Sequence, residues 1–163
     1  MMAISAEDKL GKYFDWHELC PKSVPSDPKI VANLRMLCSR ILDPLREAIR
    51  SPLIITSGYR SAEHNEAVGG AKHSYHVLGM AADVTCGYAR WTPLEIAKVA
   101  GTISAVGGLG LYAPINRLGS FIHVDLRPRG RDGKITTWYH VDGKYTDLPA
   151  DILAALKAAK VPV

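Results

Sequence analysis

The stretch SYHVLGMAAD, from Ser74 to Asp83, decides both the fold and the chemistry predicted for this chain. It places His76 seven residues before Asp83, with a glycine between the two side chains. Along one straight strand, seven residues would separate these side chains by about 23 Å. We therefore predict two short strands that flank Gly79, with a turn at this glycine that brings His76 and Asp83 together.

Neutral imidazole and carboxylate groups both bind zinc, at distances of about 2.0–2.2 Å. The best third ligand is His123, which lies in a predicted strand over residues 121–126 whose alternate residues are aliphatic. His123 and Asp125 therefore point together to the opposite, polar face of that strand. Two histidines and one carboxylate leave one tetrahedral position for water, as in catalytic zinc sites. We predict one zinc ion per chain, bound by His76, Asp83 and His123.

Hydrophobic periodicity predicts helices mainly in the first part of the chain. A long helix begins with Asp27 as N-cap and Pro28 at the first helical position, and continues to about residue 50. Pro44 lies inside this pattern and is expected to kink or split the helix. Further helices are expected at 13–19 (a short helix or turn), at 61–67, from Thr92-Pro93 to Gly107-Gly108, and over 149–160.

Strands are predicted mostly in the second part of the chain, at residues 53–56, 110–112, 121–126 and 135–140. The Asp-Gly pairs at 132–133 and 142–143 are typical of tight turns. Helices followed by hairpin-connected strands, with one helix inserted, indicate an α+β fold around an antiparallel sheet flanked by helices. The length of 163 residues fits a single domain over residues 1–163.

Composition excludes several classes of protein. With 47% apolar and 22% charged residues, the chain is typical of a folded soluble protein, and no apolar stretch is long enough to predict a membrane span. The net charge of +4 comes from dispersed Lys and Arg, so we expect no nucleic-acid partner. Three scattered cysteines do not suggest a disulfide framework. The first residues lack the pattern of a secretory signal, which predicts cytoplasmic synthesis, and a monomer is expected.

Four motifs occur in a fixed order: SGYRS at 57–61, N-x-x-VGG at 65–70, S-x-H-x-x-G-x-A-x-D at 74–83 and FIHVD at 121–125. Together they resemble the zinc D-Ala-D-Ala carboxypeptidase and L-alanyl-D-glutamate endopeptidase family, which includes phage endolysins. The amino-terminal domain of sonic hedgehog is a more distant relative with a similar metal site. The resemblance runs from about residue 14 to 127, and the third motif is its most specific element.

The resemblance implies a zinc metallopeptidase that hydrolyses peptide bonds in the stem peptides of bacterial peptidoglycan, with zinc on His76, Asp83 and His123. It also implies that Arg60 binds a substrate carboxylate or carbonyl oxygen, a task that suits its planar fork of N–H groups. Ser74 is implied to lie near the substrate. The pattern leaves open whether the enzyme is a D-Ala-D-Ala carboxypeptidase or an endopeptidase.

The general base is the least determined part of this prediction. Many endolysin relatives carry an acidic residue three positions before the last zinc ligand, where this chain has Ser120. Asp125, on the same strand face as His123, is the predicted substitute, and would move a proton from zinc-bound water to the leaving amine. Its alternative role is to orient a ligand histidine.

A different class of function also fits the motifs. The missing acid at Ser120 favours a non-catalytic module, such as a wall-binding or phage structural component built on the same fold. If the chain is an enzyme, its resemblance to endolysins and the lack of a signal predict action at the cell wall after release during phage or prophage lysis. His73 is the further histidine that lies close enough in sequence to line the pocket.

Overall fold

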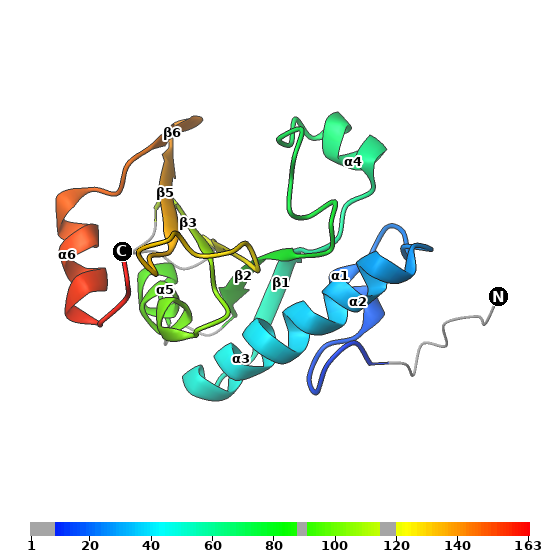
Figure 1. The fold of residues 1–163 in the computed structure, drawn as a ribbon, viewed down its shortest axis with the longest axis horizontal. Coiled ribbons are helices and arrows are strands. Elements are labelled where there is room, and N and C mark those ends of the chain that lie inside the picture. Colours follow the sequence, from blue (N-terminus) through cyan, green and yellow to red (C-terminus); the bar gives the residue numbers. More distant parts are fainter. Residues whose placement is uncertain (1–8, 88–90, 115–119) are drawn as a thin grey trace.

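The computed structural model describes residues 9–87, 91–114 and 120–163, and its centre is one six-stranded sheet (Figure 1). The strands are β1 (Leu53–Ser57), β2 (Ala81–Cys86), β3 (Gly108–Tyr112), β4 (Ile122–Asp125), β5 (Thr136–Val141) and β6 (Lys144–Thr146). Their order across the sheet is β1-β2-β4-β3-β5-β6. The predicted single-domain α+β fold is confirmed.

The sheet is mixed, whereas the sequence predicted an antiparallel one. Every neighbouring pair is antiparallel except β3 and β5, which are parallel. The β3–β5 pair is parallel because β5 joins the sheet at the free edge of β3. Both sides of β4 are occupied, by β2 and β3, so the chain must pass β3 to reach its free edge. A strand that arrives there directly after β4 runs in the same direction as β3.

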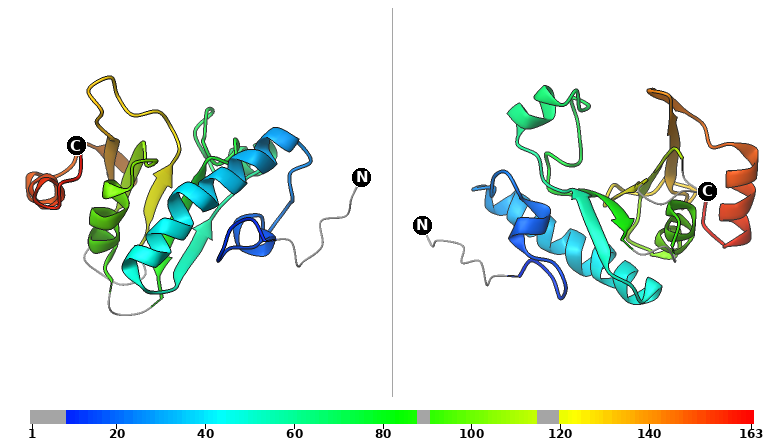
Figure 2. Two further views of the ribbon diagram at one scale, coloured as in Figure 1. Left: turned by 60° about the horizontal axis from the view of Figure 1, so that its bottom comes forward. Right: turned by 180° about the vertical axis from the view of Figure 1, so that it is seen from behind.

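The helices pack around this sheet as Figures 1 and 2 show. They are α1 (Trp16–Leu19), α2 (Pro28–Leu37), η1 (Cys38–Leu42), α3 (Asp43–Ile49), α4 (Ala62–Ala67), α5 (Pro93–Thr102) and α6 (Ala150–Ala158). The helices from α2 to α3 form a continuous rod whose α3 end lies beside α5, while α4 and the β5–β6 hairpin rise at opposite sides of the view in Figure 1. None of the described helices has the length and hydropathy needed to cross a bilayer.

The three central strands have one apolar and one polar face. The apolar face is fully buried and consists of Ala82 and Val84 of β2, Leu109 and Leu111 of β3, and Ile122 and Val124 of β4. Helix α5 covers it with Ile96, Ala97 and Ala100. Because side chains alternate along a strand, the opposite face receives Asp83, His123 and Asp125. The alternation predicted for residues 121–126 is therefore confirmed.

The long helix continues past Pro44, but it is divided beside this proline, near residue 43 as predicted, by a change of helix type. A five-residue π-helical segment, η1, precedes it, and α3 continues from Asp43. A proline inside an α-helix lacks the N–H for the carbonyl four residues earlier, and its ring collides with that carbonyl. A π-helical turn widens the backbone at this point and removes the collision. The predicted N-cap is confirmed, since the Asp27 carboxylate accepts a hydrogen bond from the Lys29 amide at 2.8 Å.

Most of the other predicted elements are confirmed. Ser61 caps α4, and Thr92 forms a capping box with Glu95 at the start of α5. Asp142 and Gly143, both with positive φ, form the turn between β5 and β6. Helix α5 ends at Thr102, earlier than predicted, because the next residue adopts an extended conformation.

The strand predicted before Gly79 is wrong. Residues 71–79 form successive turns, in which the Ser74, Val77 and Gly79 amides donate to carbonyls three residues earlier. These local bonds occupy the backbone groups that a strand would pair with a neighbour. Gly79 has a φ of +67°, so the turn predicted at this glycine is confirmed. His76 therefore approaches Asp83 from a loop rather than from a paired strand.

Replacing Gly79 by alanine is expected to lower the free energy of unfolding by about 2–4 kcal/mol. The positive φ disfavours any Cβ atom, and this Cβ would also lie 2.9 Å from the backbone oxygen of Ile30. Gly69→Ala is the matched control, since it has a φ of +68° but nothing within 4 Å, and should cost only about 1 kcal/mol. Urea denaturation measures both values, and equal losses would contradict the role assigned to the contact with Ile30.

Candidate metal centre

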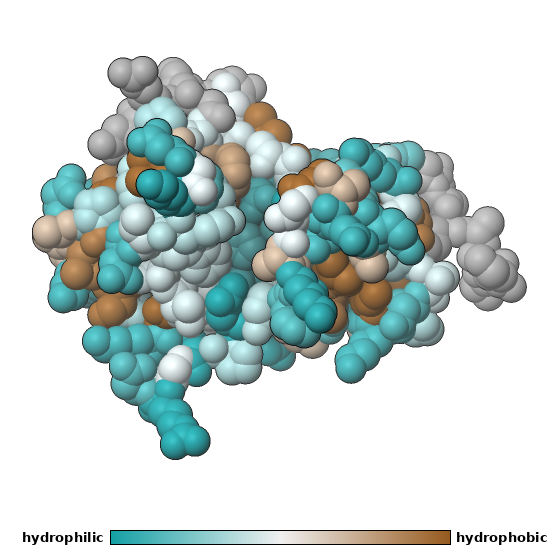
Figure 3. Space-filling model, turned by 90° about the horizontal axis from the view of Figure 1, so that it is seen from above, coloured by the Kyte–Doolittle hydropathy of each residue, from teal (hydrophilic) through white to brown (hydrophobic). Residues whose placement is uncertain are grey.

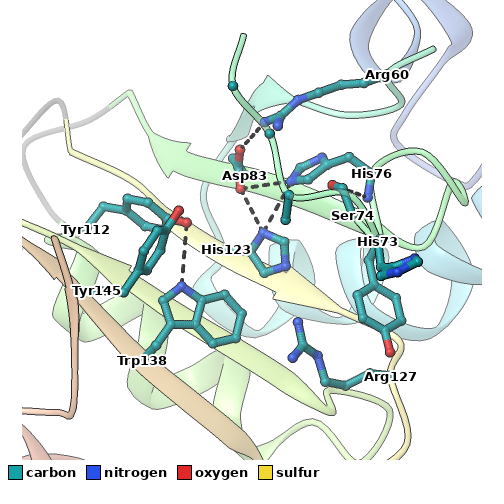
Figure 4. Close-up of a pocket in the computed structure, with 14 residues that line it drawn as sticks. Arg60, His73, Ser74, His76, Asp83, Tyr112, His123, Arg127, Trp138 and Tyr145 are labelled. Carbon is teal, nitrogen blue, oxygen red and sulfur yellow. Dashed lines mark hydrogen bonds and ion pairs between the residues drawn. The ribbon is translucent and has the colours of Figure 1, made fainter. Parts of the chain in front are cut away.

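Three polar side chains meet on the polar face of the sheet. Asp83 of β2 and His123 of β4 are direct partners in the antiparallel ladder, so their side chains are neighbours. His76 comes from the loop that precedes β2 and points to the same place (Figure 4). All three residues are buried, with 4–6% of their surface exposed. The structure therefore brings together all three residues predicted as metal ligands, from three separate segments.

The spacing of the three ligand atoms fits a tetrahedral zinc site. His76 Nε2 lies 3.3 Å from His123 Nδ1 and 3.3 Å from Asp83 Oδ1, and the His123–Asp83 distance is 3.0 Å. Ligands at about 2.0–2.1 Å from a tetrahedral ion are about 3.3–3.4 Å from one another. The two nitrogens and one oxygen are also the atom types that zinc binds in catalytic sites. The residues present could therefore hold zinc and leave a fourth position for water.

Each histidine is held by a hydrogen bond at the ring nitrogen that faces away from the candidate metal position. His76 Nδ1 lies 2.7 Å from the Gly58 carbonyl oxygen, and as the donor it leaves the Nε2 lone pair free. His123 Nε2 lies 2.9 Å from Asp125 Oδ2, which leaves its Nδ1 lone pair free. Outer hydrogen bonds of this kind fix the tautomer and orientation of histidines that bind metals.

Asp125 lies behind His123 and is fully buried. The Arg127 guanidinium holds it, with Nε at 2.9 Å from both carboxylate oxygens, and the Arg127 amide donates to Oδ1 at 3.0 Å. Burial raises the pKa of Asp125, but hydrogen bonds from His123 and Arg127 outweigh it and lower the pKa to about 2. Of the two roles predicted for Asp125, this geometry favours orientation of His123, since both of its oxygens are engaged.

Arg60 and Ser74, for which the family resemblance implied contacts with the substrate, lie beside the candidate ligands. Arg60 Nη2 donates to Asp83 Oδ2 at 3.0 Å, and Arg60 Nε donates to the Ser57 hydroxyl at 2.9 Å. The Ser74 hydroxyl accepts from the His76 amide at 3.3 Å. Without a metal ion, burial raises the pKa of Asp83, but its interactions with the adjacent His123 and His76 rings outweigh burial and hold that pKa well below its usual range.

A cavity of about 310 Å³ opens over the candidate ligands. In Figure 3 this face is hollowed between two raised parts of the surface. His73, Arg60 and Ser74 line the cavity: His73 is the histidine whose position in the sequence allowed this, and the other two are the residues that the family resemblance placed near the substrate. The lining also includes residues that the sequence did not assign to the site, among them Tyr75, Arg127, Trp138 and Tyr145. For Arg127 a signal was present, because it follows His123 and Asp125 at alternate positions.

Acid should destabilise the metal-free protein through Asp125. A carboxylate with a lowered pKa stabilises the fold above its unfolded value of 3.8, and this contribution is lost as the pH falls towards about 2. We expect a loss on the order of 2 kcal/mol between pH 5 and pH 2 from this group. Denaturant unfolding in the presence of a chelator measures it. Asp125→Asn should show a shallower dependence on pH, and an unchanged slope would contradict the assignment.

Comparison with known proteins identifies the family. A family model described as Peptidase M15 matches residues 12–125, well over half of the chain. A search of curated proteins returned no match. The matched segment runs from before α1 to the end of β4 and contains all three candidate ligands, whereas β5, β6 and α6 lie beyond it. The chain therefore belongs to the Peptidase M15 family, the zinc D-Ala-D-Ala carboxypeptidase family that its motifs resemble.

Proposed function

We propose that this chain is a zinc-dependent peptidase that hydrolyses peptide bonds in the stem peptides of bacterial peptidoglycan. Membership of the Peptidase M15 family supports a peptidase. The observation that carries the zinc dependence is the meeting of His76, Asp83 and His123, whose ligand atoms lie 3.0–3.3 Å apart. The hydrogen bonds of both histidines to Gly58 and Asp125 add support, because they leave the inward nitrogens free.

The side chains around the cavity have separate tasks in this proposal. Bound zinc would supply a more acidic water and would polarise the carbonyl of the scissile bond. Arg60 lies beside Asp83 with its guanidinium at the cavity, where it binds a substrate carboxylate or the carbonyl oxygen as charge develops there. Ser74 lines the same wall and contacts the substrate. Asp125 acts through His123, because it is enclosed and does not reach the cavity.

The second candidate is a non-catalytic wall-binding or phage structural module. One observation favours it: among the described residues that line the cavity, Asp83 is the one carboxylate, and it is a candidate ligand. Ser120, at the position where many relatives carry an acid, is engaged elsewhere, since its hydroxyl donates to the Tyr112 carbonyl at 2.7 Å. A module would bind wall peptides without cleaving them.

Turbidity of permeabilised bacterial cells, together with the products released from purified walls, distinguishes the two candidates. An endopeptidase should clear the suspension and a carboxypeptidase should release D-alanine from the walls, and either activity should be lost when a chelator removes the metal and return with added zinc. Asp83→Ala protein is the matched control and should not respond to zinc. Binding to purified walls without release of any peptide or D-alanine would contradict the enzyme and support the module.

Mass spectrometry of the digested muropeptides then identifies the bond that is cut. Loss of one terminal D-alanine marks a carboxypeptidase, and separation of the stem between internal residues marks an endopeptidase. We place this reaction at the cell wall, after release of the chain during phage or prophage lysis.

A further inference from the structure

Strand β3 has a glycine at each of its two positions next to the candidate site, Gly108 and Gly110. Gly110 pairs with His123 of β4 on one side and with Trp138 of β5 on the other. These three residues therefore form a row across the polar face of the sheet. A Cβ atom at Gly110 would lie 2.4–2.5 Å from three atoms of the indole ring. The missing side chain thus allows Trp138 to lie across β3 toward His123.

The indole contacts the candidate metal centre at two points. Its ring centroid lies 5.1 Å from that of His123, with the two planes at 54°. The Arg127 guanidinium lies 4.9 Å from the indole centroid on one side and 4.6 Å from the Tyr75 ring on another. Figure 4 shows Trp138 beside His123 and Arg127 in this way. Trp138 therefore packs on the candidate ligand His123 and on Arg127, whose guanidinium holds the Asp125 carboxylate.

This packing restricts the movements that would misplace His123. Asp125 holds one edge of the imidazole, but a single hydrogen bond still permits the ring to turn about that bond. The indole closes the space into which the ring would turn. The Arg127–Asp125 pair is restricted in the same way, because a guanidinium against aromatic rings is attracted to their faces.

We propose that Trp138 is a positioning residue of the metal centre, which holds the His123 ring and the Arg127–Asp125 pair in the orientation that presents His123 Nδ1. The inference rests on the proposed zinc site. It extends that site to β5, beyond the segment of residues 12–125 that the family model matches. Residues that orient metal ligands from outside typically change metal affinity by 10–100-fold when they are replaced.

Zinc affinity, measured by competition with a fluorescent zinc chelator, tests this role without any substrate. Trp138→Ala should bind zinc about tenfold more weakly, and Trp138→Phe should recover most of the affinity because it keeps a ring over Gly110. Tyr145→Ala is the matched control, since Tyr145 lines the same cavity but packs edge-to-face on His140, with the ring centroids 4.8 Å apart. It should bind zinc as the unchanged protein does.

A double-mutant cycle separates positioning from a general weakening of the fold. Gly110→Ala should weaken zinc binding by pushing the indole away, and it should have no further effect when Trp138 is already alanine. Additive losses, or an unchanged affinity of Trp138→Ala, would overturn the inference. Unfolding in chelator should show that each variant is folded. Failure of the unchanged protein to bind zinc would instead contradict the proposed function, so the two failures are distinguishable.

Discussion

Replacing His123 by alanine is expected to abolish zinc retention and peptidase activity together. The variant keeps only His76 and Asp83 as ligands, and two ligands do not hold zinc against a chelator at micromolar concentration. Activity should fall at least about a thousandfold, because the metal supplies several kcal/mol of stabilisation in the transition state. Metal analysis after gel filtration and a muropeptide digestion assay measure the two effects on the same sample.

His140→Ala is the control for this experiment. His140 lies in β5 and packs between Tyr112 and Tyr145, with ring centroids at 5.1 Å and 4.8 Å, so it is an aromatic residue of the same sheet that is not a candidate ligand. It should retain one zinc per chain. Stoichiometric zinc in His123→Ala would show that the ligand set is different from the one proposed.

Asp125→Asn is expected to weaken zinc binding by about 10–100-fold, with a lower turnover at limiting metal. Asparagine keeps the shape of the side chain but loses the charge that holds both His123 and Arg127. The imidazole is then less firmly oriented, and the half-buried Arg127 guanidinium loses its partner. Zinc titrations followed by kcat and KM at saturating zinc measure the two consequences separately.

The same titrations decide between the two roles that the sequence left open for Asp125. An orienting residue changes zinc affinity first, and saturating zinc restores much of the turnover. A general base leaves zinc affinity unchanged while kcat falls and the acidic limb of its pH profile disappears. This second pattern would return Asp125 to the role of base in spite of its enclosed position.

Two of the candidate ligands could be predicted because they lie on neighbouring strands, where alternation alone determines which face each side chain occupies. Asp83 and His123 belong to strands with clear alternation, and they are direct partners once β2 and β4 pair. The order of the strands in the sheet was harder to predict from the sequence. Hairpin turns indicated neighbours in sequence, but the place of β5 beside β3 depends on which edge is free after β4 has paired on both sides.

The local sequence also led to a wrong prediction, a strand, for the loop that carries His76. Val77 and Leu78 are apolar and favoured a strand, yet Leu78 is 46% exposed and the segment forms turns. The sequence also did not assign Trp138 to the site. The Trp138 side chain approaches His123 because Gly110 has no side chain. This depends on the pairing of β3 with β5, which neither segment of sequence shows by itself.

The loop of residues 71–79 forms hydrogen bonds with helix α2 and with the segment that follows β1. Asn33 of α2 donates to the Leu78 carbonyl at 2.8 Å, the Arg60 amide donates to the His76 carbonyl at 3.3 Å, and the His76 ring bonds to Gly58. His76 is thereby confined about as closely as the two ligands on strands. Little conformational entropy then has to be lost when an ion enters, so zinc uptake should be fast and should leave the backbone almost unmoved.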